Sequence, residues 1–458
     1  MTDTALLSGD VRLLTLKIAA PSVAAMLSSS ACQLLEALIL SQKDAALSAA
    51  VGASFALILL EQTVGFTLGM GAGSFVSRCI GRQSASDISQ RAAAEQAAGA
   101  AFFAAVLLAG LLLVGGFFLA APLLRLFGAS ENAVAAGVPY ARYVLASGPL
   151  LCGGLVLSSL LRAQGKTLPN MAAALVGSSL GTALLFLLCL RLNLGVHGAG
   201  LAMLAREAAT LAVLLLYAAR HAELIRPSLR RARFTLSVFA EIMRSGLPTL
   251  LRQGATSLSA AMLSRVSAGF GAPVLAGMGL CARMVMPFTS AVIGFGQGFQ
   301  PVCGAAFGAK QTSRCQTAYR FCHRVLLGFS LLLGAVFFFL APMLAARFAP
   351  DAQTADVAGR VVRLQSLVFS AQSAVILMTM LTQAMGQTVR ASLVATSRQA
   401  LFFLPLLMLL PRVFGLGGLL ACPSVSDLMA LGFSLLLTRK TFASPSSANN
   451  GREKANVP

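Results

Sequence analysis

Long, unbroken apolar runs dominate this chain. Roughly twelve of them reach the length of about 20 residues that an α-helix needs to cross a hydrocarbon core. A membrane β-strand would instead alternate apolar and polar residues with a period of two. Only 11% of the 458 residues are charged, against about 25% in a typical soluble domain. The sequence therefore predicts an all-α integral membrane protein with about twelve transmembrane helices, whose surroundings are the lipid bilayer.

The predicted spans follow one another with short connections. The first run is too long for the apolar part of a signal peptide, so we expect it to remain as a helix. The runs at 46–77 and 274–307 exceed one crossing, and we expect them to extend into the cytoplasm or to break at their glycines. In order, the predicted spans are 14–41, 46–77, 93–121, 135–162, 167–192, 196–219, 239–267, 274–307, 322–346, 357–385, 391–413 and 416–438.

Basic residues predict the orientation. The net formal charge is +20, and Lys and Arg gather in alternate loops. Cytoplasmic loops carry an excess of these residues, so we expect both termini in the cytoplasm and the protein in the inner or plasma membrane of a cell. The same bias explains the charge without a nucleic-acid partner. The loops predicted to be cytoplasmic hold Arg78, Arg82, Arg91, Arg162, Lys166, Arg220, Arg226, Arg230, Arg231, Arg233, Lys310, Arg314, Arg320, Arg324, Arg390 and Arg398.

The longest basic linker divides the chain into two sets of six spans. We expect an N-lobe at 1–219, a cytoplasmic linker at 220–235, a C-lobe at 236–438 and a polar, disordered tail at 439–458.

The two halves repeat one another, which predicts pseudo-symmetric lobes. At a shift of 227 residues Pro21 meets Pro248; at 221 Arg142 meets Arg363. At a shift of 220 Glu207 meets Asp427, a pair that we interpret as structural. Six spans per half make the repeat parallel. Secondary transporters use this design, with the substrate site between two lobes that rock about it.

One stretch concentrates glycine, glutamine and proline inside an apolar run. It reads Gly294-Phe-Gly-Gln-Gly-Phe-Gln-Pro, followed by Gly304-Ala-Ala-Phe-Gly-Ala, and a weaker copy lies at 65–81. With Leu161-Arg-Ala-Gln-Gly-Lys-Thr-Leu-Pro and Leu194-Gly-Val-His-Gly-Ala-Gly-Leu-Ala, these motifs resemble those of multidrug and toxic compound extrusion (MATE) transporters. The resemblance implies a twelve-helix efflux antiporter that exports small, usually cationic organic molecules. It also implies a proton or sodium gradient as the driving force, and we expect a monomer without a cofactor.

The resemblance places a coupling acid at the end of the first span. The family's Tyr-Asn-x-x-Asp pattern corresponds to Cys32-Gln-Leu-Leu-Glu, so Glu36 matches the acid and Gln33 the asparagine. The polar groups that the family carries in its fifth helix fall at Gly181 and Leu185, where both are lost. Coupling through the usual network of the first lobe is therefore in question.

Other polar groups inside the spans are candidates for function, because charges in a bilayer are costly. Glu61, whose repeat mate is Phe288, is predicted to be a second residue for the coupling proton or ion. Arg283 needs a carboxylate partner or a water-filled cavity, and we expect Glu36 or Glu61 across the lobe interface. The predicted substrate cavity is lined by Gln33, Gln253, Arg283, Gln297 and Gln300.

Proline and glycine predict where helices bend. Pro21 and Pro248 each remove a helical hydrogen bond and permit a kink. Gly296 and Gly298 lie in the glycine-rich stretch, which we interpret as one of two equivalent helix breaks.

Two alternatives remain open, and a third is disfavoured. A lipid-linked oligosaccharide flippase of the same superfamily would use basic cavity residues, for which Arg252, Arg265 and Arg283 are candidates. A degenerate, uncoupled member would fit the lost polar groups. A membrane enzyme is disfavoured, because the chain has no His-Glu-x-x-His motif, and the Gly-x-Ser-x-Gly match at 177–181 lies inside a span. The nine cysteines and three histidines show no metal-binding spacing, and their setting favours no disulfide.

Overall fold

The computed structural model describes residues 6–7, 9–43, 45–82, 88–126, 131–221, 225, 227 and 236–439. Every regular element in this part of the chain is helical. Most of the predicted linker at 220–235, and the tail at 439–458 save its first residue, lie outside the described residues. The elements are α1 (Val11–Lys43), α2 (Ala45–Arg82), α3 (Ile88–Leu126), α4 (Glu131–Ala163), α5 (Leu168–Leu185), η2 (Phe186–Arg191), α6 (Gly195–Arg220), α7 (Leu236–Ala268), α8 (Ala272–Gly308), α9 (Thr312–Phe348), α10 (Ala352–Ser366), α11 (Phe369–Ala384), α12 (Thr388–Thr396), η3 (Ser397–Phe403) and α13 (Leu404–Thr438).

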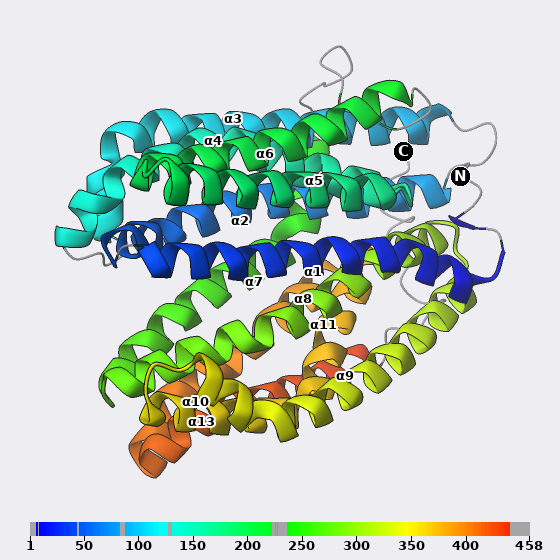
Figure 1. Ribbon diagram of the computed structural model, residues 1–458. Helices are drawn as coiled ribbons and strands as arrows, with labels where there is room; N and C mark the ends of the chain where they lie inside the picture. Colours follow the sequence, from blue (N-terminus) through cyan, green and yellow to red (C-terminus); the bar gives the residue numbers. More distant parts are fainter. Residues whose placement is uncertain are drawn as a thin grey trace.

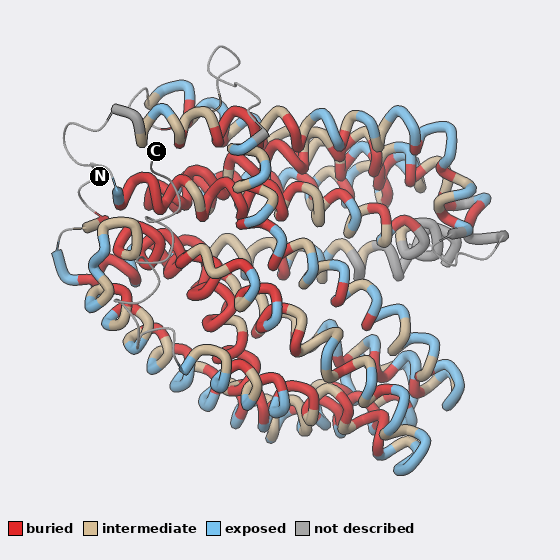
Figure 2. The backbone as a smooth tube through the Cα atoms, turned by 180° about the vertical axis from the view of Figure 1, so that it is seen from behind, coloured by how far each residue is buried: buried red, intermediate tan, exposed pale blue. Residues whose placement is uncertain are grey.

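The helices form two bodies that follow the order of the chain (Figure 1). Helices α1–α6 form one body and α7–α13 the other, which correspond to the predicted N-lobe and C-lobe. The lobes touch where α1 lies against α8 and where α2 lies against α7 and α8. They meet toward the side of the termini and diverge on the opposite side, and buried residues gather where they meet (Figure 2). The N-lobe and C-lobe are therefore joined mainly at one end.

The predicted all-α membrane fold with about twelve spans is confirmed. The described residues contain nine stretches long and apolar enough to cross a membrane, and a further pair, α10 and α11, is bent by 59° at its break. Helix α7 has 33 residues but is too polar on average to be counted among them, because Ser, Thr, Gln and Arg interrupt its apolar residues. The stretch Thr388–Thr438 divides at Gly415, whose φ of 54° is left-handed. Counting each of these as a crossing gives twelve.

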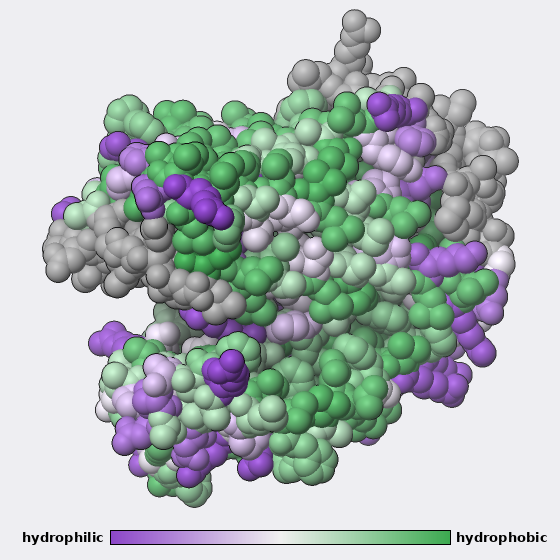
Figure 3. Space-filling view, in the orientation of Figure 1, coloured by the Kyte–Doolittle hydropathy of each residue, from purple (hydrophilic) through white to green (hydrophobic). Residues whose placement is uncertain are grey.

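The surface agrees with a position in a bilayer. Apolar side chains cover most of the face shown in Figure 3, and hydrophilic side chains gather toward the two ends of the helices. The same view shows a hollow between the lobes on the side away from the termini. Large hydrophobic residues that a soluble protein would bury are exposed on the surface, among them Phe118, Phe339 and Met343. Lipid tails would cover such a surface.

The glycine-rich stretches do not break their helices, so the predicted break at Gly294–Gly308 is wrong. Both α2 and α8 run continuously, over 38 and 37 residues. At about 1.5 Å per residue they are longer than a hydrocarbon core of about 30 Å, so the alternative that they extend beyond it holds. A Cβ at Gly298 would overlap Ala19 of α1, and one at Gly296 would overlap the sulfur of Met380. These glycines permit close packing.

Glycines also permit close packing where α2 meets the C-lobe. A Cβ at Gly81 would overlap the carbonyl oxygen of Ala305, and one at Gly308 would overlap that of Arg78. A Cβ at Gly71 would overlap the carbonyl oxygen of Ile242 on α7. The weaker copy of the motif at 65–81 and the stretch at 294–308 thus pack against one another across the lobe interface.

One cysteine pair departs from expectation. Cys303 of α8 and Cys315 of α9 are joined as a disulfide, with their Cα atoms 5.0 Å apart. The short turn between these helices brings the two residues together, although they are 12 positions apart in sequence.

We predict that Gly81→Ala weakens the contact between the lobes. The added methyl group must displace backbone, and overpacking of this kind costs roughly 1–3 kcal/mol. Gly110→Ala on α3 is the matched control, because a Cβ there would meet open space. Thermal unfolding in detergent should show a lower Tm for Gly81→Ala than for Gly110→Ala. Equal values would contradict the packing argument.

Candidate functional site

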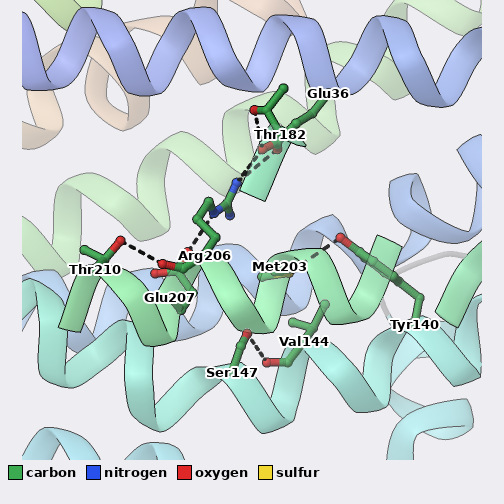
Figure 4. A network of polar contacts seen from close by, with 9 residues as sticks. All are labelled: Glu36, Tyr140, Val144, Ser147, Thr182, Met203, Arg206, Glu207 and Thr210. Atoms are coloured by element: carbon green, nitrogen blue, oxygen red, sulfur yellow. Dashed lines mark hydrogen bonds and ion pairs between the residues drawn. The ribbon is translucent and has the colours of Figure 1, made fainter. Parts of the chain in front are cut away.

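Arg206 of α6 holds two carboxylates inside the N-lobe (Figure 4). Its Nη1 donates to both carboxylate oxygens of Glu36 on α1, at 3.0 and 3.2 Å, and its Nε donates to Oε1 of Glu207 at 3.0 Å. The Thr182 hydroxyl of α5 donates to Glu36 Oε1 at 3.5 Å. The side chains of Arg206 and Glu36 are only 21% and 20% exposed. Two acids thus share one guanidinium.

Gly181 makes room for this arrangement. A Cβ at Gly181 would lie 2.9 Å from the Cβ of Arg206 and 3.1 Å from its Cδ. This is one of the two fifth-helix positions where the resemblance leads to the expectation of a polar side chain. In its place, an arginine from the neighbouring helix reaches the acid of the first span.

Glu61 of α2 is an isolated acid inside the N-lobe. It is 1% exposed, and neither of its carboxylate oxygens has a hydrogen-bond partner among the described residues. Gly148 of α4 lies directly against it, because a Cβ at that glycine would overlap Oε1 of Glu61. An unpaired buried carboxylate is costly, so it is poised to take up a proton or a cation.

The repeat shows that the fold does not require this acid. The mate of Glu61 is Phe288 at the shift of 227, and the mate of Gly148 is Phe369 at the shift of 221. These two phenylalanine rings stack, with their centroids 3.9 Å apart. An apolar pair therefore fills the position in the C-lobe that an acid and a glycine fill in the N-lobe.

The C-lobe holds its own buried ion pair. Arg398 of η3 pairs through Nε with Asp427 of α13, and the Ser426 hydroxyl donates to the Arg398 carbonyl at 2.6 Å. When the Gln372 amide is oriented with its oxygen toward Arg398, that oxygen accepts from both terminal guanidinium nitrogens, at 3.0 and 3.1 Å. The prediction that Arg398 belongs to a cytoplasmic loop is wrong, because it lies within the stretch Thr388–Thr438 that is apolar enough to span a membrane.

Arg398 also borders a cavity of about 230 Å³, which we call the C-lobe cavity. It lies among the middle parts of α7, α8 and α11, and Met70 of α2 closes it from the N-lobe side. The predicted cavity residue Gln253 lines it. Its full lining is Met70, Pro248, Thr249, Arg252, Gln253, Thr256, Thr289, Ile293, Val375, Ile376, Thr379, Met380, Gln383, Ala395, Arg398 and Gln399.

The predicted residues Gln297 and Gln300 lie at the junction of the lobes. Both border a small pocket of about 20 Å³ between α2, α4 and α8. Gln300 donates to Oε1 of Gln383 at 3.3 Å, and Gln383 donates to the Thr249 hydroxyl at 3.0 Å. Gln300 is therefore linked through Gln383 to the C-lobe cavity, whose lining includes neither Gln297 nor Gln300.

An ion pair joins the lobes beside this junction. Arg78 of α2 donates through Nη2 to Oε1 of Glu241 at 3.2 Å and to the Ser245 hydroxyl of α7 at 3.0 Å. The Arg78 side chain is only 6% exposed. The lobes are thus held together by polar contacts as well as by close glycine packing.

Two predicted site residues lie elsewhere. Gln33 and Arg283 are exposed and outside the lining of either pocket. The predicted pairing of Arg283 with Glu36 or Glu61 is wrong, because Glu36 pairs with Arg206 and neither oxygen of Glu61 has a hydrogen-bond partner among the described residues. An arginine inside span six needs a counter-charge, and that signal could have identified Arg206 from the sequence.

The two prolines that the repeat aligns lie inside helices. Pro21 is in α1 and Pro248 in α7, as expected, and Pro248 also lines the C-lobe cavity. Within the ranges that the structure describes, no group of three or more His, Cys, Asp or Glu side chains has an arrangement that could hold a metal ion.

Comparisons with known proteins agree with this architecture. The MatE family model matches residues 21–187 and 248–409. The multidrug export protein MepA of Staphylococcus aureus is 21% identical over 378 residues, which are 82% of each chain. A mutant of VcmN, a MATE transporter of Vibrio cholerae, has a TM-score of 0.88 at 22% identity, over 97% of this chain and 99% of that one. A transporter of the MOP superfamily from Pyrococcus furiosus has a TM-score of 0.89 at 21% identity, over 97% and 98%.

We predict that Arg206→Gln destabilises the N-lobe. It leaves Glu36 and Glu207 without their shared counter-charge, and breaking a buried pair in this way costs roughly 3 kcal/mol or more. Thermal unfolding should show a lower Tm, which the double variant Glu36→Gln with Arg206→Gln partly restores. Arg360→Gln is the control, because its pair with Asp356 is 64% and 55% exposed and contributes little. An unchanged Tm for Arg206→Gln would contradict the network.

Proposed function

This chain belongs to the MatE family, and from that premise we propose that it is a secondary active antiporter that exports small organic molecules in exchange for protons or sodium ions. It is a multipass membrane transporter of the multidrug efflux type. Coupling, substrate and movement of the lobes are the parts that we propose. The relatives named MepA are multidrug export proteins, and organic cations are the substrates that the resemblance leads us to propose.

The observation that carries this proposal is the excess of acid in the N-lobe. Glu36, Glu207 and Glu61 supply three carboxylates within the membrane part of the lobe, and Arg206 supplies one guanidinium to two of them. Uncompensated charge is costly in a bilayer. A proton or a sodium ion taken up at Glu61 would neutralise the carboxylate and remove that cost. Release of the proton or ion would leave the carboxylate charged again. A group that gains and loses a cation in this way meets the requirement for coupling.

The arrangement of the lobes supports alternating access. The lobes are packed together at the side of the termini, where Arg78 contacts Glu241, and they diverge at the other side. We propose that the protein lies in a cell membrane with both termini in the cytoplasm. The side on which the lobes diverge would then face the outside of the cell. The opposite conformation would then require the contacts of Arg78 and of Gly81 to part while the two lobes rock. We further propose a monomer that uses no cofactor and catalyses no reaction.

A flippase for lipid-linked oligosaccharides is less well supported. Of the three basic residues that favoured it, Arg265 and Arg283 are exposed and outside the C-lobe cavity, and Arg252 alone lines it. Arg398 also lines this cavity but is paired with Asp427, so the cavity holds about one uncompensated positive charge where a pyrophosphate group would need a cluster of them. Rescue of a strain that cannot export a lipid-linked glycan would be the result that favours the flippase.

We predict that Glu36→Gln and Glu61→Gln abolish gradient-driven efflux. Each variant keeps the shape of the side chain and removes its ability to carry a charge. Proteoliposomes loaded with a cationic dye should lose it when a pH gradient or, separately, a sodium gradient is imposed on the wild-type protein. Both variants should fall to the rate of empty vesicles, whereas Asp356→Asn, a change at an exposed surface pair, should not.

The controls separate coupling from transport in general. Efflux by Glu61→Gln at the wild-type rate would exclude it as the essential coupling acid. If neither gradient moves any dye through the wild-type protein, the antiport proposal fails, and an uncoupled member of the family is indicated.

A further inference from the structure

The charged lining of the C-lobe cavity is entirely basic. Arg252 of α7 and Arg398 of η3 both border the cavity, and none of the residues that line it is an acid. This contrasts with the N-lobe, where Glu36, Glu61 and Glu207 gather. The charged side chains of the C-lobe cavity are thus opposite in sign to the acids that gather inside the N-lobe.

The two arginines are not equivalent. Arg398 is neutralised from behind by Asp427, which is 2% exposed and does not reach the lining. The guanidinium of Arg252 makes no ion pair or hydrogen bond with any residue that the structure describes, although its backbone carbonyl accepts from Thr256 at 2.8 Å. The cavity therefore carries about one uncompensated positive charge, on a group with five N–H donors.

Neutral polar groups surround this charge. Gln253, Thr256 and Gln399 line the same cavity as Arg252 and come from α7 and η3. On the other walls Ile293, Val375 and Met380 present apolar surface. A planar guanidinium beside amide and hydroxyl groups matches an anionic oxygen group, which it can bind through two parallel hydrogen bonds. The apolar walls would receive the carbon frame to which such a group is attached.

The volume and position of the cavity indicate which part of a molecule it receives. At about 230 Å³ it is smaller than the roughly 300–1,000 Å³ of a site for a whole drug-sized ligand. Met70 of α2 forms one wall, so the cavity adjoins the interface of the lobes, where the exported molecule must pass. It has the size of a subsite for one end of that molecule.

We propose that the C-lobe cavity binds an anionic oxygen group (a carboxylate, sulfonate or phosphate) of the exported organic molecule, with Arg252 as the group that binds it. This inference rests on the proposed export function and narrows its substrate class.

The test is equilibrium binding to the purified full chain in phosphatidylcholine nanodiscs, without any gradient. Two dyes with the same xanthene frame serve as probes: carboxyfluorescein, which is anionic, and rhodamine 6G, which is cationic. Fluorescence anisotropy gives the Kd of each. Arg252→Gln should raise the Kd of carboxyfluorescein about tenfold or more, since a hydrogen bond to a charged group contributes roughly 1.5–3 kcal/mol. The Kd of rhodamine 6G should change much less.

Two further variants decide what a loss of binding means. Arg252→Lys keeps the charge but loses the planar pair of donors, so its affinity for carboxyfluorescein should lie between those of the wild-type protein and Arg252→Gln. Arg244→Gln removes one exposed charge from the same helix, two turns earlier and outside the cavity, and should leave both Kd values unchanged. Thermal unfolding of each variant separates a folding defect from a binding defect. Wild-type affinity in Arg252→Gln, or equal losses in Arg252→Gln and Arg244→Gln, would overturn the proposal.

A lipid headgroup is the other source of the same chemistry. Replacing part of the phosphatidylcholine with phosphatidylglycerol should leave carboxyfluorescein bound. Its displacement would assign the site to lipid and overturn the assignment to an exported molecule. Failure of the export function would be seen separately, as Arg252-dependent binding of carboxyfluorescein together with no gradient-driven movement of either dye in proteoliposomes.

Discussion

A charge within a bilayer must be matched by another charge or by a mobile cation, and the N-lobe is built around this constraint. Arg206 matches Glu36 and Glu207, and Gly181 leaves the space through which its side chain reaches them. Glu61 is left without a partner among the described residues. The lobe thus contains both a satisfied network and one unsatisfied acid, and only the second needs something that comes from outside the protein.

The glycine-rich stretches show a second constraint, which is the distance between helices. Gly71 and Gly81 of α2 and Gly308 of α8 allow backbone of the two lobes to meet at one end. No side chain longer than hydrogen fits there. A contact made by backbone and small residues costs little to separate. Lipid tails are as apolar as the side chains in the contact and can replace them when the helices part. Such an interface suits the proposed separation of the two lobes during transport.

The spans could be predicted from sequence because they depend on local chemistry. The predicted boundary between 391–413 and 416–438 coincides with the left-handed Gly415, and the fourth span, predicted at 135–162, is α4 at Glu131–Ala163. Partners across the lobes could not be predicted in this way. Apolar runs do not show which face of α6 meets α1, so the sequence predicts Glu36 or Glu61 as the partner of Arg283, whereas Glu36 pairs with Arg206. The glycines of α8 predict a helix break, whereas the structure uses them for close packing between helices. The sequence does not distinguish the two, because glycine serves both.

Comparison of the two repeats separates architecture from function. Where the N-lobe has Glu61 and Gly148, the C-lobe has the stacked pair Phe288 and Phe369, so the fold accepts either an acid or an aromatic pair at this place. The repeat mate of Glu207, Asp427, keeps its charge, but its arginine comes from η3 and borders a cavity. The scaffold is thus shared while the charges are not. A difference that the duplicated fold does not need supports the proposals that the N-lobe binds the coupling cation and the C-lobe an anionic group of the exported molecule.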